Sequence, residues 1–316
     1  IRAGNSGRRS ASSNIIQVML LQCPTGDVTV NTQAEADNFK ILYPNCTTIN
    51  GSLNILNSSN ITNLYGLSNI TTVNGNINII NNNVLTDCYG LRGIKRASNI
   101  NISQNSQLAE VNVFDSLSIV DYIGITNNPK LQYISGFSKV NILYELHILN
   151  NPLLTDINVK LQTNQLNVLN IKNNDKLFIL NNMGAIKEIK VALNIEDNAL
   201  LNNVNGLNLL TNSKEIKIKD NQALTNLNGL SNVTAIDGAI IIQNNDMLND
   251  ISGLRNIVYT TIKNTGLIIQ DNAILSFCNL PNFCSYLQGT GARNISGNLS
   301  DCLTEQAVIN ACNALA

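Results

Sequence analysis

The chain has 316 residues, of which 44% are hydrophobic and 13% are charged, and its net charge is −1. This composition supplies enough apolar material for a sizeable core and excludes a disordered chain. The small net charge predicts no general attraction to nucleic acid or to anionic membranes. The sequence also holds no apolar stretch near the roughly 20 residues that span a bilayer, so we expect no direct membrane insertion.

Residues 1–22 begin as a polar, basic tail and end in a short apolar run, IIQVMLLQ at 15–22. A trimmed signal peptide, a lipobox and the end of an upstream segment are alternatives. The run is short, however, and Gln22 is a poor residue before a cleavage point. We expect instead an extra strand that covers the first edge of the following sheet.

Residues 23–50 are predicted to form an N-terminal cap that contains a strand and a helix. The strand is expected at Val28–Val30, and the helix is expected to start near Thr32. Thr32 and Glu35 have the spacing of a capping box, in which each side chain binds a free backbone N–H of the first turn. Pro44 is expected to end the helix.

Residues 51–277 contain a repeat whose template is Ile/Leu-x-Ile-x-x-Asn-x-x-Leu, as in INIINNNVL at 77–85. Ten copies fit the template, and LNILNSSNI at 53–61 carries Ser58 in the Asn position. Most copies lie 23 or 24 residues apart, and the last step is 27. The recurring amides are Asn82, Asn105, Asn128, Asn151, Asn174, Asn198, Asn221, Asn245 and Asn272.

A second half follows the template in many copies. Six residues after the Asn position comes an apolar residue, which is Cys88 in the second copy, and a Gly-Leu or Gly-Phe pair often comes next. Another apolar residue follows three positions later. Because aromatic residues make up only 4% of the chain, Ile, Leu and Val must fill the core.

The repeat predicts a right-handed parallel β-solenoid that resembles a leucine-rich repeat and has about ten coils, a coil being one winding of the chain. In each coil the two template apolars point inward and the residue between them points outward. The Asn side chain is expected to enter the turn, where its donor and acceptor satisfy buried backbone groups of its own or the next coil. The alternative, a disordered Asn-rich tract, would not keep apolar positions in register over ten copies.

Residues 278–316 are predicted to form a C-terminal cap, with a last degenerate repeat at Asn298 and a helix from Thr304 to Cys312. Six of the seven cysteines cluster at the two ends, which is typical of a disulfide-bonded protein in an oxidising compartment. We expect Cys23 to pair with Cys46. The other four allow three connectivities, and our choice is Cys278–Cys302 with Cys284–Cys312. Zinc is the rival interpretation, but the sequence holds no CxxC and a single histidine.

The rhythm of strand, Gly-Leu and strand in LYGLSNITTVNGNINIINN resembles the receptor L-domain, the leucine-rich-repeat-like β-helix of insulin and epidermal-growth-factor receptor ectodomains. The segments GDVTVNTQAEADNF and YPNCTTINGSLNI and the Cys-rich end resemble the caps of bacterial surface proteins with such repeats. The resemblance covers about residues 23–316 and implies a secreted or surface location. It carries over no ligand-contact motif, although the receptors bind protein ligands through these domains.

The sequence predicts no catalytic site, because nucleophilic catalysis needs a positioned base and His147 is the only histidine. We interpret His147 as an ordinary exposed residue, and Asp197, Asp220 and Asp271 as part of a solvated surface with cross-strand ion pairs rather than as calcium ligands. The outward strand positions are the candidate ligand-binding face, with apolar patches toward both ends, where Ile241 and Ile268 belong to the second patch. Its candidate residues are Leu56, Ile80, His147, Leu149, Lys172, Glu196, Lys217 and Lys219.

The sequence therefore favours a non-enzymatic, extracellular or cell-surface binding or adhesion module, without cofactor or metal. Its expected partner is a protein or glycan on a cell surface. The alternative is a structural subunit of a surface layer or filament, which would bind copies of itself. A carbohydrate-active enzyme is the least favoured hypothesis, since such solenoids cluster acidic or basic residues along one groove.

Overall fold

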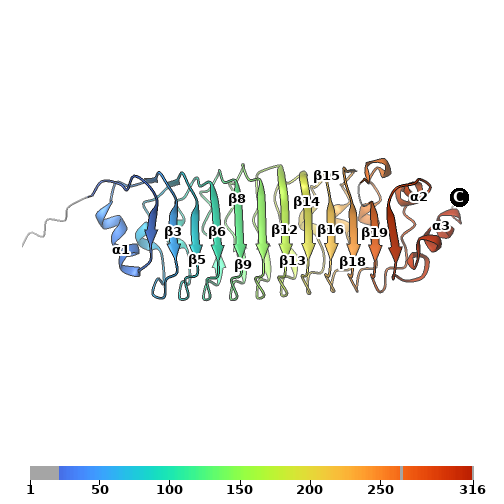
Figure 1. Cartoon of the computed structure of the whole chain (residues 1–316), viewed down its shortest axis with the longest axis horizontal. Helices are drawn as coiled ribbons and strands as arrows, with labels where there is room; N and C mark the ends of the chain where they lie inside the picture. Colours follow the sequence, from blue (N-terminus) through green and yellow to red (C-terminus); the bar gives the residue numbers. More distant parts are fainter. Residues whose placement is uncertain (1–20, 264–265, 315–316) are drawn as a thin grey trace, which may run out of the picture.

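The computed structural model describes residues 21–263 and 266–314. The strand expected at 15–22 therefore lies almost wholly outside the described residues. Within them the chain winds into a parallel β-solenoid, a rod whose strands stand side by side along its length (Figure 1). Helix α1 lies at one end of the rod, and helices α2 and α3 lie at the other (Figure 1).

The main sheet has 14 strands in the described part of the chain, and every pairing within it is parallel. Its spatial order follows the chain from one end of the rod to the other. The strands along this path are β1 (Val28–Val30), β3 (Leu53–Leu56), β5 (Ile77–Ile80), β6 (Asn99–Ser103), β8 (Tyr122–Thr126), β10 (Glu145–Leu149), β12 (Gln165–Lys172), β14 (Glu188–Glu196), β16 (Ile216–Lys219), β18 (Ile240–Gln243), β19 (Leu267–Gln270) and β20 (Arg293–Ser296).

Shorter strands form further parallel ladders on other sides of the coils. One ladder joins β7 (Glu110–Val111), β9 (Tyr133–Ser135), β11 (Asp156–Asn158) and β13 (Ile179–Leu180), and another joins β2 (Thr48–Ile49) and β4 (Thr72–Val73). Two more short strands continue the main sheet beside β14, namely β15 (Asn212–Ser213) and β17 (Ala235–Ile236).

The core is a column of inward apolar side chains. In β5, for example, Ile77 and Ile79 are fully buried, whereas Asn78 and Ile80 are half-buried on the outward side. The same alternation holds in β3, β16, β18 and β19, as the template predicts. Cys88 is also fully buried and unpaired, and burial, together with the charge of Asp87, raises the pKa of its thiol to about 12.

The predicted row of buried amides is confirmed, and we call it the Asn ladder. Asn151 is representative: its Nδ2 donates to the carbonyl of Ile125 in the preceding coil at 3.0 Å, and its Oδ1 accepts the backbone N–H of Asn128 at 3.1 Å. The ladder runs from Asn82 to Asn298, whose Oδ1 accepts the N–H of Asn272, and every member is at most 5% exposed. Each amide thus satisfies backbone groups that would otherwise be buried without partners.

The residue before each Asn of the ladder adopts a left-handed backbone, which explains the Asn-Asn and Asp-Asn pairs of the sequence. Its φ is between 52° and 58° before Ser58 and before the amides from Asn82 to Asn272, and it is 70° at Gly297, before Asn298. Asn and Asp tolerate this region better than most residues with a side chain. The position is occupied by Asn57, Asn81, Gln104, Asn127, Asn150, Asn173, Asp197, Asp220, Asn244 and Asp271.

The Gly-Leu pairs lie in short 3₁₀ helices that bring the backbones of neighbouring coils together. A Cβ added to Gly90 would lie 1.6 Å from the carbonyl oxygen of Leu64, so only glycine fits there. These helices include η1 (Tyr65–Leu67), η2 (Tyr89–Leu91), η3 (Asn205–Leu207), η4 (Asn228–Leu230) and η5 (Ser252–Leu254). The leucines that follow the glycines are buried.

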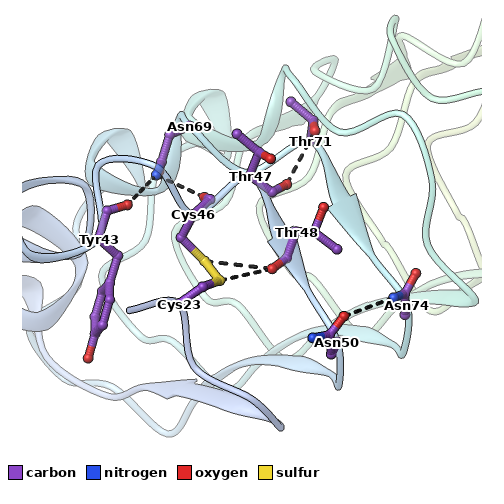
Figure 2. Close-up of a disulfide and its surroundings, with 9 residues drawn as sticks. All are labelled: Cys23, Tyr43, Cys46, Thr47, Thr48, Asn50, Asn69, Thr71 and Asn74. Carbon is purple, nitrogen blue, oxygen red and sulfur yellow. Dashed lines mark hydrogen bonds between the residues drawn. A yellow bond between two sulfur atoms is a disulfide. The ribbon is translucent and has the colours of Figure 1, made fainter. Parts of the chain in front are cut away.

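The N-terminal cap follows the prediction closely. Helix α1 (Gln33–Leu42) begins after the cap residue Thr32 and has the expected capping box with Glu35. Figure 2 shows the Cys23–Cys46 disulfide, which joins two segments of this cap. Beside it Asn69 donates to the carbonyls of Tyr43 and Cys46, both at 2.9 Å, so that the first coil holds the end of the cap (Figure 2).

The C-terminal cap contains the expected helix α3 (Glu305–Asn313) and, in strand β20, the strand of the degenerate repeat expected at Asn298. The sequence analysis missed helix α2 (Pro281–Leu287). The disulfides Cys278–Cys302 and Cys284–Cys312 are the pairs chosen from the sequence. A short 3₁₀ helix, η7 (Ser300–Cys302), leads into α3, and another, η6 (Tyr259–Thr261), contacts α2.

Candidate functional site

The outward side of the main sheet, which we call the strand face, presents side chains in columns that run along the rod. The register places Leu56 opposite Ile80, and Leu149 opposite Lys172, Glu196 and Lys219 in turn. The neighbouring column contains His147 and Lys217. The eight candidate residues therefore share one face and two adjacent columns, but they are spread over several coils and do not converge on one point.

At the N-terminal end of the strand face, outward asparagines form chains of side-chain hydrogen bonds. Asn78 Nδ2 donates to Asn54 Oδ1, and Asn101 Nδ2 donates to Asn78 Oδ1, both at 2.8 Å. A parallel chain runs from Asn99 to Asn76 at 2.9 Å. Because each amide is held by its neighbour, this part of the face is rigid and polar.

The middle of the strand face carries an ion-pair cluster centred on Glu196. Its side chain is only 9% exposed and contacts Lys172 at 2.7 Å and Lys217 at 3.1 Å. Burial alone would raise the pKa of Glu196, but the hydrogen bonds and charges of the two lysines outweigh it and hold the pKa below its usual value. Glu196 is thus ionised at neutral pH and paired with both lysines, as the expected cross-strand pairs imply.

Beside this cluster, two carboxylates of the left-handed turn positions lie close together. Burial, followed by the charges of Asp220 and Glu196, raises the pKa of Asp197. Lys219 pairs with Asp220 at 3.3 Å. Within the described residues, no group of three or more His, Cys, Asp or Glu side chains is arranged to hold a metal ion.

His147 is not the ordinary exposed residue that the sequence suggested. Its side chain is 17% exposed, its Nε2 lies 3.1 Å from Glu145 Oε2, and its ring centroid lies 5.1 Å from that of Tyr122. Neighbouring coils stand only about 4.8 Å apart, so outward side chains cover one another. Gly124, which separates Asn101 from His147 in this column, leaves the space into which Tyr122 leans.

The apolar patches expected on the strand face are much less exposed than predicted. All of their residues are half-buried, because outward side chains of neighbouring coils cover one another. They are Leu56, Ile80, Leu149, Ile241 and Ile268. Among the described residues, the most exposed large apolar side chains lie outside the main strands. They include Phe277 at 63%, Phe178 at 59% and Met247 at 52%.

Sequence reasoning also missed a hollow at the start of strands β8 and β10. It has a volume of about 460 Å³ and opens widely to solvent. The lining side chains are Asn99, Asn101, Asp121, Tyr122, Tyr144, Glu145 and Asn167. The one sequence signal for it was Gly124, where the column that begins with Asn54, Asn78 and Asn101 loses its side chain.

Neither the comparison with protein-family models nor the search of curated proteins finds a match for this chain. In the part of the chain that is described, no helix has the length and apolarity needed to cross a membrane.

Proposed function

We propose that this chain is a non-enzymatic binding or adhesion module of an extracellular or cell-surface protein, and that its strand face contacts a protein or glycan. The observation that carries the proposal is the face itself. No helix of the described chain packs over it, and helices α1, α2 and α3 lie at the ends of the rod (Figure 1). Its amides and ion pairs are fixed by one another, so binding would cost little side-chain ordering.

Two further features support the proposal. The disulfides Cys23–Cys46, Cys278–Cys302 and Cys284–Cys312 fit an oxidising compartment outside the cytoplasm. The coil rhythm resembles that of receptor L-domains, which are extracellular binding domains. Together they favour secretion and display over an intracellular role.

A binding screen tests this function. Biotinylated protein is applied to arrays of extracellular proteins and glycans, in parallel with Asn78→Arg and Lys219→Glu, which alter the strand face. Asn83→Arg is the matched control, because Asn83 is exposed on the turn that follows Asn82 of the ladder and does not belong to the strand face. We expect a ligand that the face variants lose and the control retains. A ligand that both face variants retain would move the site elsewhere, and empty arrays would count against a binding role.

A second candidate, a subunit of a surface layer or filament, is favoured by exposed apolar residues near the C-terminal end of the rod. Phe277, Leu299 and Leu303 are 63%, 49% and 50% exposed. Exposed apolar side chains that lie near one another often mark contacts between proteins. Solution mass over a concentration series separates the two functions, because a binding module stays monomeric whereas a subunit assembles.

A further inference from the structure

The hollow at the start of β8 and β10 lies where the outward amide chains end. Asn99 is paired in register with Tyr122, and Asn101 is paired with Gly124. In each chain the Nδ2 group donates backward, to Asn76 and to Asn78 respectively. The Oδ1 atoms of Asn99 and Asn101 are thus left on the side of the next coil, where no amide follows, and no residue of the described chain donates to them.

Two carboxylates add negative charge to this group of acceptors. Glu145 contributes one oxygen to the contact with His147, and Asp121 is exposed at the rim. Among the described lining residues there is no lysine or arginine. The site therefore offers amide and carboxylate oxygens without a compensating cation, in contrast to the lysine-rich cluster around Glu196 on the same face.

Two phenol rings complete the walls. Tyr144 is 47% exposed, and Tyr122 leans over Gly124, where an added Cβ would lie 2.5 Å from the Tyr122 hydroxyl. Burial, followed by the charge of Glu145, raises the pKa of Tyr122, so this phenol stays neutral at physiological pH. Aromatic faces attract cations, and guanidinium in particular stacks on them.

We propose that this hollow is a subsite for a basic side chain of a protein partner, with the guanidinium of arginine or the ammonium of lysine seated between Tyr122 and Tyr144. The cation donates hydrogen bonds to Asp121, Glu145 and the amide oxygens. This inference rests on the proposed binding function and specifies the chemistry that one part of the strand face recognises. Arginine fits best, because its planar fork matches paired oxygen acceptors and stacks on rings.

The test uses short peptides and the full chain labelled with ¹³C-tyrosine. The probes are acetyl-Gly-Gly-Arg-Gly-Gly-amide, its lysine counterpart, and its citrulline counterpart, which keeps the shape of arginine without its charge. Signals of the two tyrosines are assigned with Tyr122→Phe and Tyr144→Phe. We expect the arginine and lysine peptides to shift these signals in a salt-sensitive way, and the citrulline peptide to have little effect.

Variants define the roles of the walls. Asp121→Asn combined with Glu145→Gln should lower the affinity for the arginine peptide by about tenfold or more, because both hydrogen bonds lose the negative charge of their acceptor. Tyr144→Ala should lower the affinity for this peptide by about twofold to fivefold, which is the range of an exposed cation–π contact. The controls are Asp175→Asn with Asp246→Asn, which remove the same charge from exposed sites on the turns, and Tyr89→Ala, which removes a tyrosine that is 42% exposed elsewhere.

Equal binding of the citrulline peptide would overturn the inference, as would binding that the carboxylate variants leave unchanged. Tyrosine shifts with neutral N-acetylglucosamine oligomers but not with the arginine peptide would instead assign the hollow to glycans. The array experiment keeps the two proposals distinguishable. If the Asp121→Asn, Glu145→Gln variant still binds a partner found on the arrays, the arginine subsite is wrong but the binding function stands. If the arginine peptide binds but the arrays give no partner, the subsite stands and the binding function loses its support.

Discussion

At the scale of single residues, the buried asparagines are structural. Asn151 illustrates the reason: its amide serves the carbonyls of Ile125 and Leu149 and the N–H of Asn128, all of which are shielded from water. A hydrophobic side chain of similar size would fill the space but would remove the acceptor of the Asn128 N–H and the donor to the Ile125 carbonyl, whereas the Leu149 carbonyl would keep the N–H of Asn127. An unpaired buried polar group costs about 1–3 kcal/mol, so the amide is worth more than its net hydrogen bonds suggest.

Asn151→Ala should therefore lower the free energy of unfolding by about 3 kcal/mol or more, since several buried groups lose their partner at once. Urea unfolding followed by circular dichroism measures the loss, and hydrogen exchange at the Asn128 amide reports it locally. The control is Asn150→Gly, which keeps a left-handed turn at an exposed position and should cost below about 1 kcal/mol. Equal unfolding midpoints for the two variants would contradict a structural role for the ladder.

The Asn ladder and the inward strand positions could be predicted because their spacing repeats along the chain. The hollow could not, because it depends on single departures from the repeat. Gly124 indicates a hollow only once two facts are known: the register places it between Asn101 and His147, and Tyr122 leans across it. Such a contact between coils has no periodic signature in the sequence.

At the scale of elements, the 3₁₀ helices set how closely neighbouring coils approach. Gly90 lies in η2, directly against the backbone of the preceding coil, whereas Gly93 follows the same helix and has ordinary clearance, with 3.4 Å from its added Cβ to the nearest atom. The capped helix α1 could be read from the sequence through Thr32 and Glu35. Helix α2 could not, because it has seven residues and its cap residue Leu280 makes no side-chain hydrogen bond.

The two glycines of this coil provide a matched pair. Gly90→Ala should lower the unfolding free energy by about 2 kcal/mol or more, since backbone cannot move aside as a side chain does. Gly93→Ala should change it by less than about 1 kcal/mol. Thermal unfolding of both variants measures this difference in stability. Similar melting temperatures would show that the coils can separate at η2 without a loss of stability.

At the scale of the whole molecule, the rod is a stack in which each coil buries the apolar face of the next. Its ends are therefore the places where association would begin. The C-terminal cap covers β19 with β20, which α3 contacts in turn, and supplies Asn298, which accepts the buried N–H of Asn272 at 3.0 Å. The bonds Cys278–Cys302 and Cys284–Cys312 both lie within this cap and tie its segments together.

Removal of residues 278–316 should consequently turn a monomer into an associating species. β19 would become an open edge with the sequence LIIQ, and the N–H of Asn272 would lose its acceptor. Light scattering over a concentration series measures the effect. The control is Cys278→Ser with Cys302→Ser, which keeps the cap in place and should remain monomeric while losing about 3 kcal/mol of stability. If the shortened chain stayed monomeric with unchanged circular dichroism, the cap would not be what keeps the open edge of β19 from associating.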